Sequence, residues 1–270
     1  MAEQPDNATK QKCVSTFATS SKGGASAGVP KTLDEALSEI GFGPFQWRLM
    51  MVLAVGQMAD AMEITLLSFL APCVQSEWGL SSAQTSSITS VVFAGELLGS
   101  LFWGPLADRR GRRATYLASL SAILVAGLAS AGAEGYAWLL AARGLVGVGV
   151  GGGCVPFDFF AEVLPQERRG RALAFLQLFW GGGSLLVAAV AAAGLEAHGW
   201  RPLVLVCCAP VALAALAAHL YLPESPRWLL AQGRDREAKQ VVLEAARLNG
   251  VDLEGFILVN SLRTGQGQGG

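Results

Sequence analysis

The sequence predicts an all-α protein that crosses a membrane six times. Three observations support this prediction: six long apolar stretches, an apolar fraction of 52% against 15% charged residues, and 33 glycines, which suit close helix packing in lipid. The first stretch contains two carboxylates, Asp60 and Glu63. An Asp at membrane depth costs roughly 2.5–3.5 kcal/mol, so such residues point to a pathway or a relay.

The six predicted spans each hold enough residues to cross a bilayer, which needs about 20 at a rise of about 1.5 Å per residue. A soluble protein with six consecutive buried core helices is the alternative, and the scarcity of amphipathic segments between the stretches argues against it. The third and fifth spans carry no charge, whereas the others contain isolated polar residues. The predicted spans are 49–74, 84–106, 114–133, 136–157, 172–194 and 202–222.

Charge and cysteine content exclude several other classes of protein. The formal net charge of −1 gives no argument for nucleic-acid binding. The five cysteines show neither paired spacing nor a CxxC motif, so we predict no disulfide framework and no metal site. No Ser/His/Asp set is apparent, and the two histidines are His198 and His219. We therefore predict no catalytic residue, no enzyme activity and no cofactor.

Polar segments flank the predicted bundle, which covers residues 32–222. Residues 1–31 are rich in Ser, Ala, Thr and Gly and lack a long apolar run, so we predict a disordered cytosolic tail. A capping box at Thr32 to Glu35 predicts a short helix before the first span. In the segment 223–270 we expect a helical turn at Ser225-Pro226 and an amphipathic helix, Asp235 to Leu248, stopped by Asn249-Gly250.

Basic residues gather on one side of the predicted membrane. The segments after the second, fourth and sixth spans are arginine-rich. The loops on the other side, 75–83, 134–135 and 195–201, contain a single basic residue, Arg201. The positive-inside rule therefore puts both termini in the cytosol.

Polar residues of the first span are expected to share one helix face. Gln57, Asp60 and Glu63 recur at a spacing of three residues, and this face must look toward protein or water. Arg143, near the outer end of the fourth span, needs an anionic partner, for which Asp60 and Glu63 are the candidates. Such a pair could line a pathway in which a proton or substrate competes for the carboxylate, or it could be a static link between helices. Glu96, mid-span in the second helix, either lines the same pathway or forms an interior hydrogen bond.

The fourth span carries a glycine run that continues from Arg143 to Gly153. Glycines at 147, 149, 151 and 153 lack side chains on opposite faces, so two neighbouring helices can approach closely. A nucleotide-binding loop is excluded because no strand precedes the run and no Lys-Ser/Thr follows it.

A basic segment, Gly104 to Arg113, joins the second and third spans. We expect its glycines to permit a tight turn between two helix ends, Asp108 to interact with a helix terminus, and Arg112 to reach a neighbouring carboxylate, with Glu162 as the first choice. A loop that only fixes topology is the alternative, but it would not require Gly and Asp at these positions.

These motifs resemble those of the major facilitator superfamily. Gly104 to Arg113 is similar to the family's loop between helices two and three, Ala161 to Gly170 to its motif after helix four, and Pro223 to Trp228 to its motif after helix six in sugar and organic-ion porters. Ile40 to Trp47 and Ala59 to Glu63 most resemble the synaptic-vesicle-glycoprotein-2-related members. The resemblance runs from about Leu33 to Leu253.

The resemblance implies a transporter that works by alternating access. Asp108, Arg112 and Glu162 would form a cytosolic charge network that stabilises the outward-facing state, and Asp60 and Arg143 stand where proton-coupled sugar porters pair an Asp with an Arg. The short first outer loop favours a porter of small organic solutes. The remaining network positions that the motifs imply are Gly104, Arg109, Gly111, Arg169, Glu224 and Arg227.

Family members have twelve helices in two halves, with the substrate between them. The resemblance thus implies that this chain is the N-terminal half, ending before helix seven. Its expected partners are the lipid bilayer, a small organic solute, protons as candidate coupling ions, and a C-terminal half or another chain. The alternative is a truncated, non-transporting isoform or fragment that associates with a full-length partner.

Overall fold

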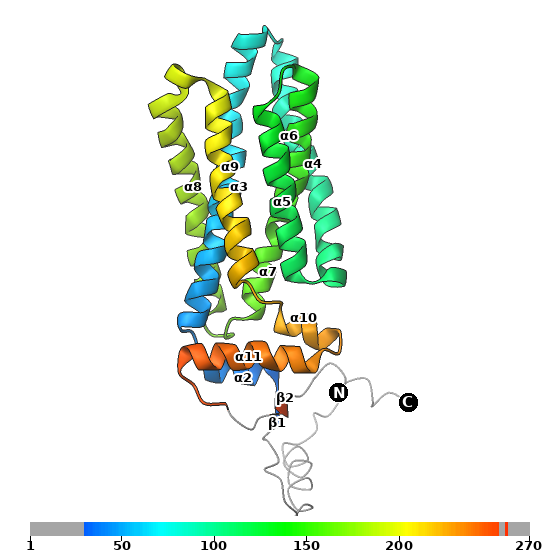
Figure 1. Ribbon diagram of the computed structural model, residues 1–270, viewed down its shortest axis with the longest axis vertical. Coiled ribbons are helices and arrows are strands. Elements are labelled where there is room, and N and C mark those ends of the chain that lie inside the picture. The colour runs from blue at the N-terminus through cyan, green and yellow to red at the C-terminus, as the bar shows by residue number, and fades with distance from the viewer. Residues whose placement is uncertain (1–29, 254–256, 259–270) are drawn as a thin grey trace, which may run out of the picture.

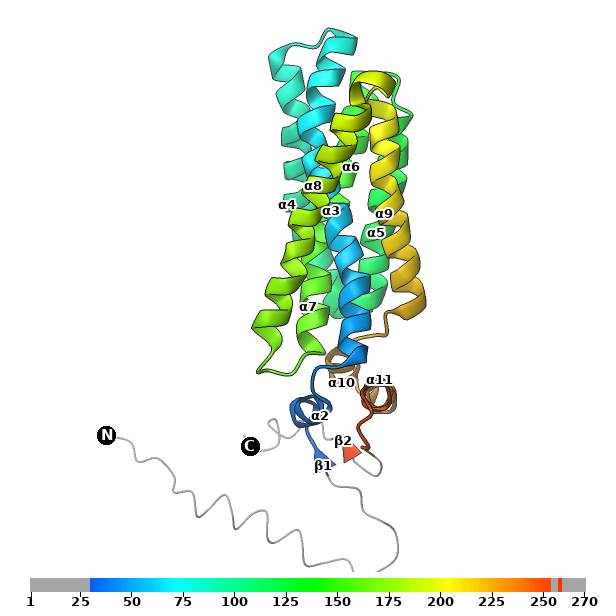
Figure 2. The same cartoon turned by 90° about the vertical axis from the view of Figure 1, so that its left-hand side faces the viewer.

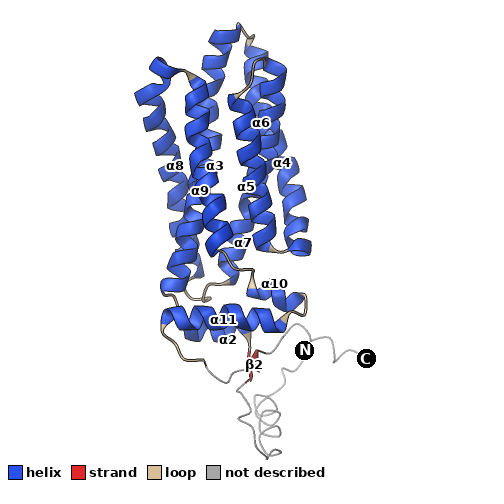
Figure 3. Cartoon of the chain, viewed as in Figure 1, coloured by secondary structure: helices blue, strands red, loops and turns tan. Residues whose placement is uncertain are grey.

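The computed structural model describes residues 30–253 and 257–258, and these residues are almost entirely helical (Figure 3). Within them, six helical segments are long and apolar enough to cross a membrane, which confirms the predicted fold class. They are Pro44–Trp78 (α3), Ser82–Arg110 (α4), Arg112–Ala131 (α5), Tyr136–Glu162, Arg169–His198 (α8) and Trp200–Tyr221 (α9). The fourth divides into Tyr136–Val150 (α6), a 3-10 turn at Gly151–Gly153 (η1) and Cys154–Glu162 (α7).

Several helices extend beyond the apolar stretches that predicted them. The first begins at Pro44 rather than near 49 and continues to Gly79, which ends it in the left-handed conformation with φ +61°. Ser81 then opens α4 with a capping box to Gln84. Hydropathy marks only the part of a helix that suits lipid, whereas caps decide where its backbone ends.

The six spans form one bundle with α3 at its centre (Figures 1 and 2). Helix α3 packs on α8 and α9, α5 packs on α6 and α9, and α4 packs on α6. More of α3 is buried than of any other span, whereas α4 and α8 are mostly exposed. The apolar sides of α4 and α8 are therefore free for lipid or for another protein.

Glycines bring α4 and α6 into backbone contact. A Cβ added to Gly95 would lie 2.3 Å from the Gly144 carbonyl oxygen, and one added to Gly147 would lie 2.1 Å from the Val92 oxygen. Gly149 faces the other way, toward Ile123 of α5. The predicted use of the glycine run, close approach by two neighbours, is confirmed.

Short helices cover the end of the bundle at which the arginines gather, which is the end that the positive-inside rule predicts to be cytosolic. They are Leu33–Ile40 (α2), Pro226–Ala231 (α10) and Asp235–Asn249 (α11). The predicted capping box of α2 is present, with Thr32 and Glu35 bonded reciprocally. Helix α11 ends at Gly250, as predicted, and buries Val242 and Ala245.

The last residue of α11 holds the beginning of α3. Asn249 Oδ1 accepts the Phe45 N–H at 3.0 Å, and Asn249 Nδ2 donates to the side chain of Gln46 at 2.9 Å. Arg48 also pairs with Glu244 at 2.9 Å. The segment after the sixth span is thus tied to the start of the first.

Of the predicted tail, 1–31, residues 1–29 lie outside the described part of the chain. Pro30–Lys31 (β1) pairs in parallel with Ile257–Leu258 (β2), with Pro30 opposite Ile257. The end of the segment 223–270 also lies outside the described residues from 259 onward.

Candidate functional site

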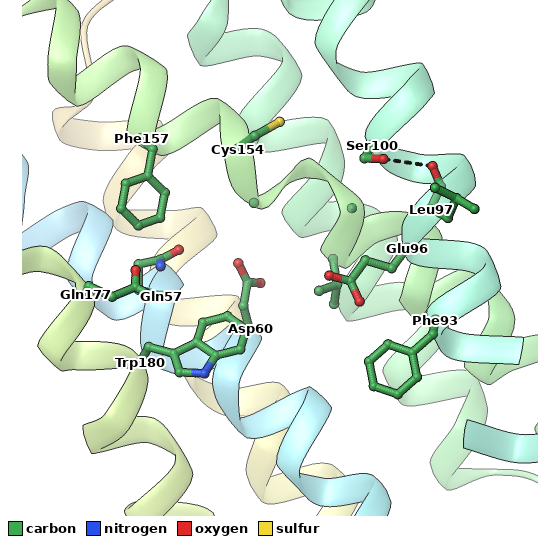
Figure 4. Close-up of a pocket in the computed structure, with 13 residues that line it drawn as sticks. Gln57, Asp60, Phe93, Glu96, Leu97, Ser100, Cys154, Phe157, Gln177 and Trp180 are labelled. Atoms are coloured by element: carbon green, nitrogen blue, oxygen red, sulfur yellow. Dashed lines mark hydrogen bonds between the residues drawn. The ribbon is translucent and has the colours of Figure 1, made fainter. Parts of the chain in front are cut away.

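A cavity of about 510 Å³ opens beside the middle of α3 (Figure 4). Three of the five predicted pathway residues line it, namely Gln57, Asp60 and Glu96. The other two, Glu63 and Arg143, lie outside its lining. Further lining residues come from α4, α6, η1, α7 and α8: Phe93, Leu97, Ser100, Val150, Gly151, Gly153, Cys154, Phe157, Gln177 and Trp180.

Asp60 lies at the inner wall of this cavity, on the central helix. The residue is only 3% exposed, its Oδ1 is fully buried, and no described residue donates a hydrogen bond to its carboxylate. A Cβ on Gly153 would lie 3.5 Å from Asp60 Oδ2, so the glycine of η1 leaves room for the carboxylate. A buried carboxylate without a partner is costly in a membrane protein unless something neutralises it.

Arg143 pairs with Glu63, not with Asp60. Arg143 Nη1 donates to Glu63 Oε2 at 2.8 Å, and both side chains are fully buried. The pairing of Asp60 with Arg143 that the resemblance implied is therefore wrong. Arg143 stands near the outer end of its span, and Glu63 lies about 4.5 Å further toward the outer end of α3 than Asp60 does. Arg143 therefore lies at the level of Glu63, the carboxylate nearer the outer end, and pairs with it.

The Glu63–Arg143 pair is enclosed by α5 and α9. A Cβ on Gly127 would lie 2.9 Å from Cys208 Sγ and 3.6 Å from Glu63 Oε1, so glycine is needed where α5 passes the pair. Glu63 Oε1 and Arg143 Nε and Nη2 have no hydrogen-bond partner in the described residues. The pair links helices behind the cavity and does not line it.

Glu96 reaches into the cavity from α4, on the side opposite Asp60 (Figure 4). Trp180 lies beside Asp60 in the same view, and Gln57 and Phe157 close the far side. None of the lining residues is Lys, Arg or His. Two carboxylates thus share a cavity of aromatic and amide side chains, an environment that suits a cation.

Arg112 forms the predicted link, at the end of the bundle that is predicted to be cytosolic. Arg112 Nη1 donates to Asp108 at 2.6 Å, and its Nη2 donates to Glu162 of α7 at 3.3 Å. The Ser225 hydroxyl donates to the second oxygen of Glu162. One carboxylate therefore connects the start of α5 with the segment that precedes α10.

Glu224 caps α5. Glu224 Oε1 accepts the backbone N–H groups of Arg112 at 2.8 Å and Arg113 at 3.1 Å. Gly111 forms the turn before α5 with φ +101°, and a Cβ there would lie 2.3 Å from Glu224 Oε2. Glu224 can therefore cap α5 in this position only because residue 111 has no side chain.

Other predicted network residues occupy different positions from those expected. Gly104 lies inside α4 with nothing within 4 Å of an added Cβ, so the turn is made at Gly111 and not by both glycines. Arg227 pairs with Asp34 of α2 at 2.6 Å. Arg169 lies near Arg112 and Glu162 in a cavity of about 390 Å³ at the same end of the bundle, and it forms no ion pair with any described residue. Arg109 is exposed at the end of α4.

Sequence reasoning missed the contribution of α8 to the central cavity. Gln177 and Trp180 line it, three residues apart and therefore on one helix face. The isolated Gln in an otherwise apolar span was the available signal. Trp228, whose Nε1 donates to the Asp108 carbonyl at 2.8 Å, was missed because nothing in its spacing indicates that contact.

Comparisons with known proteins agree with this architecture. The chain is 40% identical over 233 residues to "Organic cation/carnitine transporter 7" of Arabidopsis thaliana, covering 86% of this chain and 46% of the relative. It is 37% identical over 221 residues to "Synaptic vesicle 2-related protein" of Xenopus laevis, covering 82% and 40%. The chain spans less than half the length of these curated relatives.

Among solved structures, the proton:xylose symporter XylE of E. coli, with bound 6-bromo-6-deoxy-D-glucose, has a similar fold. The TM-score is 0.67 at 22% identity, over 82% of this chain and 51% of that chain. Residues 53–263 match the Major Facilitator Superfamily, which is most of the chain. The six-helix bundle and the two relatives agree with this match, and the chain belongs to the Major Facilitator Superfamily.

Proposed function

We propose that this chain forms the N-terminal six-helix half of a secondary transporter that moves a small organic solute by alternating access. The observation that carries the proposal is the mid-membrane cavity with two carboxylates, Asp60 and Glu96, and no cation in its lining. Ionisable residues at membrane depth are costly and favour a pathway. The transporter names of the relatives support the same function.

The cavity favours a solute that carries positive charge. Asp60 and Glu96 supply negative charge, and Trp180, Phe157 and Phe93 supply aromatic surface over which an ammonium group can lie. Arg143 does not compensate this charge because Glu63 neutralises it outside the cavity. The name of the Arabidopsis relative, an organic cation/carnitine transporter, supports a cationic solute.

Asp60 is also the proposed proton site. Its carboxylate has no basic partner in the described part of the bundle, so a proton or the charged group of a solute is what can neutralise it. A proton and a cationic solute that compete for Asp60 would be moved in exchange for one another. The proton:xylose symporter XylE, which shares the fold, supports proton coupling only by analogy.

A second six-helix unit would complete the transporter. The open side of the cavity is lined by exposed residues of α4 and α8, among them Leu97, which is 63% exposed, and Gln177. In transporters built from repeats, the substrate lies between two such units. We propose that the mostly exposed sides of α4 and α8 face that second unit, supplied by a C-terminal half or by another chain.

Solute binding can be tested on the chain itself because Cys154 is exposed and lines the cavity. In proteoliposomes, millimolar tetraethylammonium should slow maleimide labelling of Cys154, whereas xylose should not. The protection should be lost in Asp60→Asn and in Glu96→Gln, and Cys154→Ser gives the background from the other thiols. If xylose protected Cys154 from labelling and tetraethylammonium did not, the proposal of a cationic solute would be overturned.

Coupling requires the second half, so uptake is measured with the chain co-expressed with a second six-helix unit of the family. Asp60→Asn should abolish both accumulation driven by a pH gradient and exchange of the cation at equal concentrations, since the neutral side chain can hold neither the proton nor the charged group of the solute. Glu63→Asp, outside the cavity, is the matched control that keeps a carboxylate. Fully gradient-driven uptake by Asp60→Asn would refute the proton role.

A further inference from the structure

A second cavity, of about 340 Å³, lies at the cytosolic ends of α3 and α8. It is lined by Phe42, Trp47, Met50, Arg168, Arg171, Ala172 and Phe175, and it shares no residue with the central cavity. Helices α3 and α8 pack on one another, and the Trp47 ring of α3 contacts the Phe175 ring of α8 at this end. The proposed transport pathway does not use this cavity.

The walls of this cavity are aromatic and face outward. The Trp47 ring packs edge-to-face on Phe42, with centroids 5.6 Å apart, and on Phe175, with centroids 5.9 Å apart. Trp47 is 47% exposed and Phe175 41% exposed, so the rings present apolar surface to whatever surrounds the bundle. Aromatic side chains at a helix end are typical of the level where acyl chains meet headgroups.

Two arginines at the rim carry uncompensated positive charge. Arg168 and Arg171 are exposed, and no carboxylate in the described residues forms an ion pair with either. Arg112, Arg143 and Arg227 differ because each pairs with a Glu or an Asp. The cavity therefore combines an apolar wall toward the bilayer with two free guanidinium groups toward the cytosol.

We propose that this cavity binds an anionic phospholipid of the cytosolic leaflet. Arg168 and Arg171 would hold the phosphate of the headgroup, and the first part of an acyl chain would lie against Trp47 and Phe175. Guanidinium groups are suited to phosphate, and basic pockets between helices on the cytoplasmic side recognise such headgroups. The proposal rests on the cytosolic position of this end of the bundle and is independent of solute transport.

The test is direct binding of lipid to the purified chain in neutral detergent. Native mass spectrometry should show a phosphatidylglycerol adduct that outcompetes phosphatidylcholine of the same acyl chains. Arg168→Gln with Arg171→Gln should weaken the adduct about 30-fold, because each basic residue near the surface contributes roughly a five- to sixfold gain in binding. The control double variant, Arg110→Gln with Arg236→Gln, removes the same charge from exposed arginines elsewhere and should retain binding.

Each remaining outcome decides the proposal. Equal loss in both double variants would mean attraction by net charge alone and would overturn the site, as would unchanged binding in the Arg168/Arg171 variant. Trp47→Ala should reduce the phosphatidylglycerol adduct but leave the unfolding temperature in neutral detergent close to that of the parent. Competition by millimolar inorganic phosphate as effective as that by the lipid would assign the site to free anions instead.

Discussion

Glu63 Oε2 and Arg143 Nη1 lie 2.8 Å apart, and neither side chain has any exposed surface. Asp60, one helical turn away, has no partner in the described residues. Two carboxylates on one face of α3 thus have opposite environments, and substitutions at them should have opposite consequences.

Removing the charge of Glu63 should destabilise the chain. Glu63→Gln leaves the Arg143 guanidinium buried without compensation, which costs roughly 3–5 kcal/mol, whereas Asp60→Asn removes an unpaired carboxylate and should cost little. Thermal unfolding in a neutral detergent measures both. The double variant Glu63→Gln with Arg143→Met should recover most of the loss, and a drop for Asp60→Asn as large as that for Glu63→Gln would contradict the assignment of the pair.

Two glycines that were predicted to act together should respond differently to alanine. Gly111→Ala forces φ +101° on a residue with a Cβ and pushes against Glu224, which should cost roughly 1–3 kcal/mol. Gly104→Ala, inside α4 with open space around it, should stabilise the isolated chain by about 0.5–1 kcal/mol. Unfolding temperatures of the two variants give the comparison, and equal shifts would argue against the turn at Gly111.

Glu162 and Asp108 should contribute unequally to the stability of the end of the bundle where they lie. Glu162 is only 15% exposed and receives bonds from both Arg112 and Ser225, whereas the side chain of Asp108 is 69% exposed. Exposed ion pairs contribute roughly 0.2–1 kcal/mol to stability. Trypsin should therefore cleave the cytosolic face fastest in Glu162→Gln, more slowly in Asp108→Asn, and at the parental rate in Arg110→Gln. Identical rates in all three would mean that the segment only fixes topology.

The membrane orientation that the distribution of arginines predicts can be checked by labelling. In a version inserted in the plasma membrane, cysteines introduced at Ser81 and Glu134 should react with an impermeant maleimide from outside, and one at Gln166 should not. The first two positions lie at the end of the bundle opposite α2, α10 and α11. The reverse pattern would place both termini outside.

Much of the architecture could be predicted because hydropathy, arginine distribution and glycine spacing are local properties. The glycine run predicted close contact on two faces, and Gly147 and Gly149 indeed approach α4 and α5. The ends of the helices were harder to predict from the sequence, since α3 continues through polar residues up to its cap, Gly79. Backbone capping, which hydropathy does not report, decides those positions.

The partners of charged residues were harder to predict because they depend on relative depth. Spacing alone left Asp60 and Glu63 as candidates for Arg143, and only the level of the arginine in the bundle selects Glu63. The contact of Arg227 with Asp34 joins residues 193 positions apart, and no sequence pattern links them. The loop network was predictable in part, since Arg112 and Glu162 belong to recognisable motifs.

The glycine contacts between α4 and the fourth span also limit genetic variation. An added Cβ at Gly95, Gly99, Gly147 or Gly151 would lie within 2.1–2.4 Å of a backbone oxygen of the facing helix. Every missense change at these four codons adds at least a Cβ atom. Each such change would therefore force the two helices apart. Carriers of such alleles should lose the protein to quality control, whereas the codons of Val125 and Leu128, which are exposed on α5, should vary freely among apolar residues.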